Sequence, residues 1–247
     1  MQASAYEHFD IESAELLHEL VQSVVSALEA RDPHTADHSL RVGDMTERVC
    51  AIMGISGVEA FEIHMAAHVH DIGKIGLRDS ILMKGSRLTE EEHRALRMHP
   101  EIGYRILSSS DRLSGIAQIV LCHHERWDGS GFPRGLAGRD IPFGARIVSV
   151  CDSIDAMLGK RPVRKRLTEQ ACRSEIIAGS GSLYDPDVVD VVVSNWDEVL
   201  EGIVERIRCD EEESDSESHA SLRCVVPMTD AYGHSEMSSG GENKESA

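Results

Sequence analysis

Histidine and aspartate side chains recur along this chain at spacings that suit metal ions. Nine of the 13 histidines fall between His34 and His124. His34 and His38 are four residues apart, as are His64 and His68, so each pair can share one helix face and reach one ion. Spacing alone does not separate the two pairs, and either of them could be unrelated to metal binding.

The segment His70-Asp-Ile-Gly-Lys74 is a stronger candidate. It joins a neutral nitrogen ligand to a carboxylate, Asp71, that can bridge two ions, and Lys74 follows within reach of a bound phosphate. The alternative interpretation is a helix C-terminus that ends on a favourable histidine before a loop.

Further nitrogen and oxygen donors come from separate segments: His99 before Pro100, the adjacent pair His123 and His124, and Asp152. Adjacent helical residues point roughly 100° apart, so the pair is expected to serve two neighbouring ions. The mixed donor set suits Mn²⁺, Fe or Zn²⁺. Two ions at ~3.5–4 Å can hold a hydroxide nucleophile and neutralise a phosphoryl group during in-line attack. These residues therefore predict a two-metal phosphoester hydrolase.

A basic segment lies farther along this acidic chain, Arg161-Pro-Val-Arg164-Lys-Arg166. Arginine binds phosphate or a guanine edge through two hydrogen bonds, so the segment is a candidate clamp on an anionic ligand. A solvated turn is the alternative.

The elements that must position these residues are predicted to be helices. Leu17, Val21, Val24 and Leu28 form an apolar stripe that predicts a helix over residues 11–31, either packed on the core or serving as a connector or dimer helix. Asp32-Pro33 is typical of a helix start, and the helix that follows should turn Val42, Met45, Val49, Ile52 and Met53 inward.

Similar signals predict the remaining helices. Thr89 begins a capping box, and Pro100 is expected to stop its helix near His99. Further helices are expected over residues 58–71 and 116–126, and after Pro142, Thr168 and Asp185. No segment alternates strictly enough to require a β-sheet, so the predicted fold class is all-α.

Composition excludes several functional classes. The net charge of −18 argues against non-specific nucleic-acid binding, which needs surplus Lys and Arg. The six cysteines form no CxxC pair, which indicates reduced thiols in a cytoplasmic protein, and no apolar run is long enough for a membrane span. The acidic stretch 209–247 is expected to be disordered. The expected organisation is a connector at 1–31, one domain at 32–208 and the tail.

The ordered series of motifs resembles the HD-GYP family, a branch of the HD superfamily of metal-dependent phosphohydrolases, from about Ala27 to Val189. The resemblance rests on His34-Thr-Ala-Asp-His38, His70-Asp-Ile-Gly-Lys74, His99-Pro100, His123-His-Glu-Arg-Trp-Asp-Gly-Ser-Gly-Phe-Pro133 and Cys151-Asp-Ser-Ile-Asp155. It implies an HD-domain helical bundle with a C-terminal HD-GYP extension, built around two or three divalent ions, with Fe or Mn favoured. It also implies hydrolysis of cyclic di-GMP to pGpG, and in some members to GMP, by a hydroxide held between metals.

The resemblance also implies roles for individual residues. Lys74 corresponds to the lysine that contacts phosphate, and Arg161 and Arg164 to residues that contact the dinucleotide. His34 stands where some members have a Glu that helps to hold a third metal. The positions that correspond to metal ligands are His38, His70, Asp71, His99, His123, His124 and Asp152. Outside the motifs, His64 and His68 are expected to be structural, and His93 exposed.

Two departures from the family pattern bear on the substrate. Phe132 stands in the Tyr position of the signature and keeps the aromatic ring for stacking or packing, and Val163 replaces an aromatic residue that follows Arg-Pro. These departures keep open the same chemistry on another nucleotide phosphoester. The acidic tail keeps open a second alternative, a non-catalytic adaptor that binds cyclic di-GMP or a partner. The partners implied are cyclic di-GMP, a diguanylate cyclase, sensor or receiver proteins, and a second copy in a homodimer.

Overall fold

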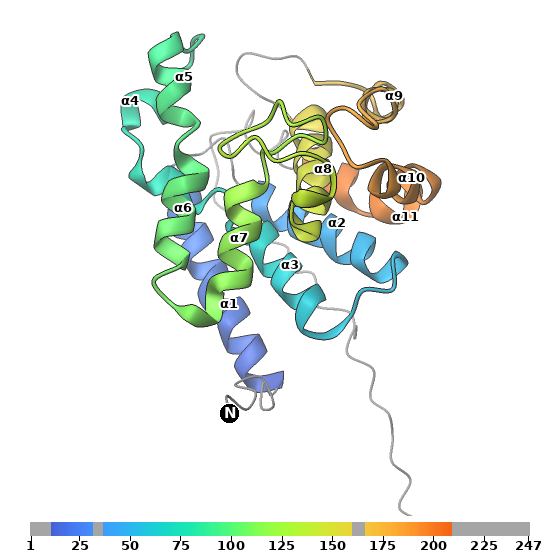
Figure 1. Ribbon diagram of the computed structural model, residues 1–247, viewed down its shortest axis with the longest axis horizontal. Helices are drawn as coiled ribbons and strands as arrows, with labels where there is room; N and C mark the ends of the chain where they lie inside the picture. Colours follow the sequence, from blue (N-terminus) through green and yellow to red (C-terminus); the bar gives the residue numbers. More distant parts are fainter. Residues whose placement is uncertain (1–10, 32–36, 160–165, 209–247) are drawn as a thin grey trace, which may run out of the picture.

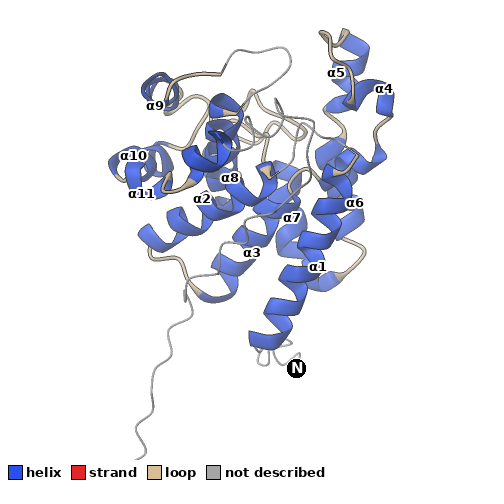
Figure 2. Ribbon diagram, turned by 180° about the vertical axis from the view of Figure 1, so that it is seen from behind, coloured by secondary structure: helices blue, strands red, loops and turns tan. Residues whose placement is uncertain are grey.

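Helices build the part of the chain that the computed structural model describes, residues 11–31, 37–159 and 166–208 (Figures 1 and 2). Within these ranges there is no strand, only an isolated bridge between Ser180 and Tyr184. The all-α prediction is therefore confirmed. In chain order the elements are α1 (Ile11–Glu29), α2 (His38–Ile52), α3 (Gly57–Val69), the 3₁₀ helix η2 (Ile72–Gly76), α4 (Asp79–Leu82), α5 (Glu90–Leu96), α6 (His99–Leu107), η3 (Asp111–Leu113), α7 (Ser114–Cys122), η4 (Gly138–Asp140), α8 (Phe143–Leu158), α9 (Glu169–Ala178), α10 (Pro186–Ser194) and α11 (Trp196–Val199).

An aliphatic core lies between α2, α3, α7 and α8, with α6 packed on α7. Val42, Met45 and Val49 of α2 are fully buried, as their spacing predicts, whereas Ile52 and Met53 are only partly buried. Each fully buried side chain of this kind stabilises the fold by ~1.5–3 kcal/mol. This packing fixes the helices that carry the histidine and aspartate candidates.

The N-terminal helix α1 packs along α3, but with one apolar position different from the prediction. Val25 and Leu28 are buried, and Leu17 and Val21 pack against the core. Val24, by contrast, is 46% exposed. The buried stripe follows spacings of four, four and three residues, and Val24 lies about 100° from Val25 around the helix.

Three predicted helix starts are confirmed by their caps. The Thr89 side chain accepts a hydrogen bond from the Glu92 amide and completes a capping box. The Thr168 and Asp185 side chains each accept a hydrogen bond from an amide in the first turn of α9 and α10. The predicted start at Asp32-Pro33 lies outside the described residues.

Two predicted helix ends are wrong. The helix that Thr89 begins ends at Leu96, and His99 and Pro100 open the next helix, α6. Proline is tolerated there because the amides of a first helical turn need no intrahelical partner. Helix α7 ends at Cys122 rather than near Arg126, which leaves His123 and His124 just beyond it.

The bundle has two flanks. Figures 1 and 2 show α4 and α5 on one side of it and α9, α10 and α11 on the other. The four cysteines of the described residues, Cys50, Cys122, Cys151 and Cys172, are buried free thiols. None of the described helices is long and apolar enough to cross a membrane. Residues 209–247, for which disorder was expected, lie outside the described ranges.

Candidate metal centre

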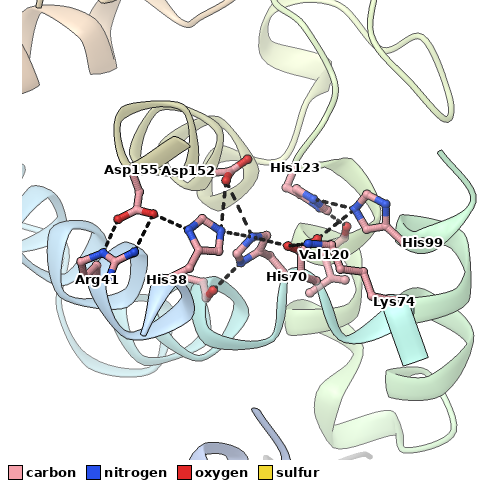
Figure 3. Close-up of polar contacts among 11 residues, drawn as sticks. His38, Arg41, His70, Lys74, His99, Val120, His123, Asp152 and Asp155 are labelled. Atoms are coloured by element: carbon pink, nitrogen blue, oxygen red, sulfur yellow. Dashed lines mark hydrogen bonds and ion pairs between the residues drawn. The ribbon is translucent and has the colours of Figure 1, made fainter. Parts of the chain in front are cut away.

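Helix ends and turns bring most of the predicted ligands to one place (Figure 3). His38 opens α2, His70 and Asp71 follow α3, and His99 opens α6. His123 and His124 follow α7, and Asp152 comes from the middle of α8. Side chains at such termini can converge on one point while their helices diverge.

The first group of donors consists of His38, His70 and Asp152. The Nε2 atoms of His38 and His70 are 3.3 Å apart. Asp152 Oδ1 lies 3.3 Å from His38 Nε2 and 3.9 Å from His70 Nε2. Three donor atoms this close together suit a single ion.

The second group consists of His99, His123 and His124. The Nε2 atoms of His99 and His123 are 3.3 Å apart. The rings of His123 and His124 have centroids only 4.0 Å apart. Both histidines thus lie beside His99, and His123 keeps helical backbone angles at the end of α7. That the two residues serve separate ions stays a prediction.

Asp71 lies between the two groups. Its Oδ2 is 3.4 Å from His70 Nε2 in the first group, and its Oδ1 is 3.2 Å from His99 Nε2 in the second. Lys74 Nζ lies 2.7 Å from Asp71 Oδ2. One carboxylate thus faces both groups, with a positive charge beside it.

Gly73 allows this close approach. A Cβ at this position would lie 1.8 Å from the His99 carbonyl oxygen, so only glycine lets η2 pack against the start of α6. The glycine of the His70-Asp-Ile-Gly segment therefore holds Asp71 beside His99.

The imidazole rings are oriented by their Nδ1 atoms. His70, His99 and His123 each donate a hydrogen bond from Nδ1 to the carbonyl three residues earlier, at 2.7, 2.8 and 2.6 Å. Nε2 of each ring is then left with its lone pair, facing the centre. Because two such lone pairs face each other at 3.3 Å between His99 and His123, the arrangement fits a bound cation.

Protonation states agree with metal binding in the second group. Burial lowers the pKa of His99 and His123, and it lowers the pKa of His124 to about 4. Burial opposes ionisation of Asp71, but Lys74 and the neighbouring histidines outweigh it and hold the pKa of Asp71 well below its usual range. Neutral imidazoles and an ionised carboxylate are the ligand forms that metals require.

Asp155 lies behind the candidate ligand His38, and no role was predicted for it from the sequence. It lies one turn after Asp152 on α8, is buried, and its Oδ2 lies 2.5 Å from His38 Nδ1. Arg41 donates from Nε to its Oδ1 at 2.6 Å. Burial opposes protonation of His38, but Asp155 and Asp152 outweigh it and raise the pKa of His38 to about 9. The spacing of three residues between the two aspartates was the available signal.

Phe132 packs against His124, a member of the second group. Its ring centroid is 4.9 Å from that of His124, and the guanidinium of Arg97 lies 5.1 Å from the ring centroid. Glu125, which is buried, accepts hydrogen bonds from the amides of Arg134 and Leu136. The Glu125 carboxylate, also missed in the sequence, therefore fixes the loop that carries Phe132.

Other predicted residues lie elsewhere. His34, Arg161 and Arg164 are outside the described residues. His93 is exposed, as expected. His64 and His68 belong to a separate cluster.

Comparison with known proteins agrees with this fold. A family profile described as HD domain matches residues 22–188. A cyclic di-GMP phosphodiesterase of Thermotoga maritima is 43% identical over 197 residues, which are 79% of this chain and 54% of that protein. The 3′3′-cGAMP-specific phosphodiesterase 2 of Vibrio cholerae is 38% identical over 184 residues, 74% of this chain and 35% of that protein.

Solved structures share the fold. The crystal structure of a cyclic GMP-AMP-specific phosphodiesterase of Vibrio cholerae superposes with a TM-score of 0.58 and 19% identity, covering 77% of this chain and 52% of that one. The chain spans about half the length, or less, of these three relatives. It belongs to the HD domain family, in its HD-GYP branch.

Proposed function

We propose that this protein hydrolyses a phosphodiester bond of cyclic di-GMP and releases pGpG as the first product. The observation that carries the proposal is the position of Asp71, whose two oxygens face two separate groups of ligand side chains. A cyclic di-GMP phosphodiesterase that is 43% identical supports the choice of substrate.

The donor set determines what the centre would hold. Its mixture of imidazole and carboxylate suits Fe or Mn, and a pair of such ions supplies an activated water and neutralises phosphoryl charge. His34 is a candidate for holding a third ion. One ion would be held by His38, His70 and Asp152, the other by His99, His123 and His124, and both by Asp71.

Lys74 provides a positive charge at the edge of the centre. It is buried, and its Nζ is 2.7 Å from Asp71 Oδ2. In this position the ammonium group can bind a non-bridging phosphate oxygen and stabilise the negative charge that develops there, which in other enzymes is worth about 10²–10³ in rate for one such group.

Phe132 and the basic segment supply the contacts to the nucleotide. The Phe132 ring lies beside His124 and below Arg97, where a guanine base can stack at the edge of the centre. Arg161 and Arg164 are proposed to bind the phosphate or guanine edge of the same ligand.

A second candidate substrate is 3′3′-cGAMP. A relative that is 38% identical is named as specific for it. The two cyclic dinucleotides differ in one base, so the same metal chemistry serves both, and contacts to the base decide between them.

A side-by-side turnover assay tests the proposal. The full chain is loaded anaerobically with Mn²⁺ or Fe²⁺, its metal content is measured, and kcat/KM is determined for cyclic di-GMP, 3′3′-cGAMP, cyclic di-AMP and pGpG. We expect the highest value for cyclic di-GMP, with pGpG as the first product. A higher value for 3′3′-cGAMP would replace the substrate, and a metal-loaded protein that leaves every cyclic dinucleotide intact would refute the proposal.

A further inference from the structure

A third cluster of histidines lies outside the metal centre, where α1 packs on α3. His18 comes from α1, and His64 and His68 come from consecutive turns of α3. Figures 1 and 2 show the two helices side by side. The cluster therefore connects the N-terminal helix to the helix that leads into His70 and Asp71.

The donor atoms of the cluster have the spacing of ligands around one ion. His68 Nε2 is 3.1 Å from His64 Nε2 and 3.3 Å from His18 Nε2. All three histidines offer a ring nitrogen within 4.8 Å of the other two. Zn–N bonds of 2.0–2.1 Å in a tetrahedron place neighbouring nitrogens about 3.3–3.4 Å apart.

Surrounding groups orient these rings. His64 Nδ1 lies 3.3 Å from the carbonyl of Gly43, so its Nε2 faces the cluster with a free lone pair. Gly43 also makes room for the second ring, because a Cβ there would lie 2.5 Å from His68 Cε1. Among the described residues the buried Nδ1 of His68 makes no hydrogen bond of ordinary geometry, although the backbone of Ser39 interacts with this ring.

Burial lowers the pKa of His18, which favours the neutral form that a metal needs. Gln22, one turn after His18, has its side-chain amide 3.5 Å from His18 Nε2. Its oxygen or a water molecule can complete a four-coordinate site.

We propose that His18, His64 and His68 form a further metal site, of the zinc type, that fastens α1 to α3. Three imidazoles and no carboxylate distinguish it from the mixed nitrogen and oxygen donors of the centre around Asp71. The other end of α1 is already held, since Arg31 donates hydrogen bonds to Asp79 at the start of α4 and to the carbonyl of Ile75 in η2. An ion at the histidine cluster would hold the opposite half of the helix.

Zinc stoichiometry of the full chain tests this site without reference to phosphoester turnover. His18→Ala removes one ligand from a half-buried position, and His64→Gln is a second variant that keeps a polar side chain. His93→Ala is the matched control, because it removes an exposed histidine. After chelation and reloading, we expect wild type and His93→Ala to bind one more zinc per chain than either ligand variant.

Two further readouts accompany the zinc count. Co²⁺ in a four-coordinate site absorbs visible light far more strongly than six-coordinate Co²⁺, and we expect this absorption to be lost in His18→Ala. Zinc should also raise the Tm of wild type more than that of His18→Ala, since metal bound to the folded state alone stabilises it. Circular dichroism checks that the variants are folded.

The expected loss of zinc affinity is more than about 100-fold, because even an outer partner of a metal ligand is worth 10–100-fold. If folded His18→Ala and His64→Gln bind as much zinc as wild type and keep the Co²⁺ absorption, the histidines are only a hydrogen-bonded packing cluster and the proposal is wrong.

Discussion

Oδ2 of Asp155 lies 2.5 Å from Nδ1 of His38, and this contact orients the ring of that candidate metal ligand. The same carboxylate is bound by Arg41, so it is held from two sides in the interior. A carboxylate behind a ligating histidine fixes the ring and increases its basicity. Asp155 is therefore a positioning residue for the centre (Figure 3).

Replacing Asp155 with Asn should weaken metal binding without removing a ligand. We expect Asp155→Asn to lower the affinity of the first site by about 10–100-fold and to lower turnover at limiting metal. Metal titration followed by turnover at saturating metal measures both. Asp190→Asn, an exposed aspartate on α10, is the control. Equal metal affinity in Asp155→Asn and wild type would show that the contact has no positioning role.

Lys74 should affect the chemical step more than metal content. We expect Lys74→Ala to lower kcat by about 10²–10³ while both ions stay bound, because the ammonium group stabilises charge that develops during reaction. Lys74→Arg should recover part of the loss. If Lys74→Ala loses metal but has normal kcat once metal is restored, the role of Lys74 is to position Asp71 rather than to stabilise charge during the reaction.

Phe132 should act through His124. We expect Phe132→Ala to lower metal affinity at the second site by about tenfold, because the ring that packs against His124 is removed. Phe132→Tyr keeps the ring and should match wild type in metal content and kcat/KM. Metal analysis of Phe132→Ala tests whether the packed ring supports the second site. A turnover assay of Phe132→Tyr tests the hydroxyl, and a gain in kcat/KM in that variant would show that the hydroxyl is required for full activity.

Gly73 should be intolerant of a side chain. A Cβ there meets the His99 carbonyl oxygen at 1.8 Å, so Gly73→Ala must displace η2 or α6. We expect a loss of about 1–3 kcal/mol in unfolding free energy and loss of metal at the second site. Gly85→Ala is the control, since its Cβ would meet nothing within 4 Å. Chemical denaturation of both variants gives the comparison, and equal stability would contradict the close approach described here.

The sequence placed the candidate ligands in ordered motifs but did not show how their side chains are grouped. Local signals such as the Thr89 capping box are encoded in adjacent residues, so they could be read directly. The position of His123 and His124 beside His99 could not be read from spacing, because it depends on the packing of α6 on α7. Pro100 fits either the end or the start of a helix, and only tertiary packing decides between them.

Contacts distant in sequence account for the other omissions. Asp155 is 117 residues from His38, and its spacing from Asp152 marks a shared helix face but does not identify the buried partner. His18 is 50 residues from His68, and only the packing of α1 on α3 brings them together. The metal centre was recognisable because its ligands occur in ordered motifs, whereas the histidine cluster has no such pattern.

The most direct test of the two-site centre is turnover measured against bound Mn²⁺, with wild type and Asp71→Asn compared on cyclic di-GMP. If Asp71 serves both groups of ligands, wild-type turnover rises only when both hold an ion, and Asp71→Asn loses affinity at both sites and hydrolyses no substrate. His18→Ala, carried alongside, should follow the wild-type curve. Full wild-type turnover with one bound ion, or an Asp71→Asn protein that keeps both ions and its activity, would contradict this account.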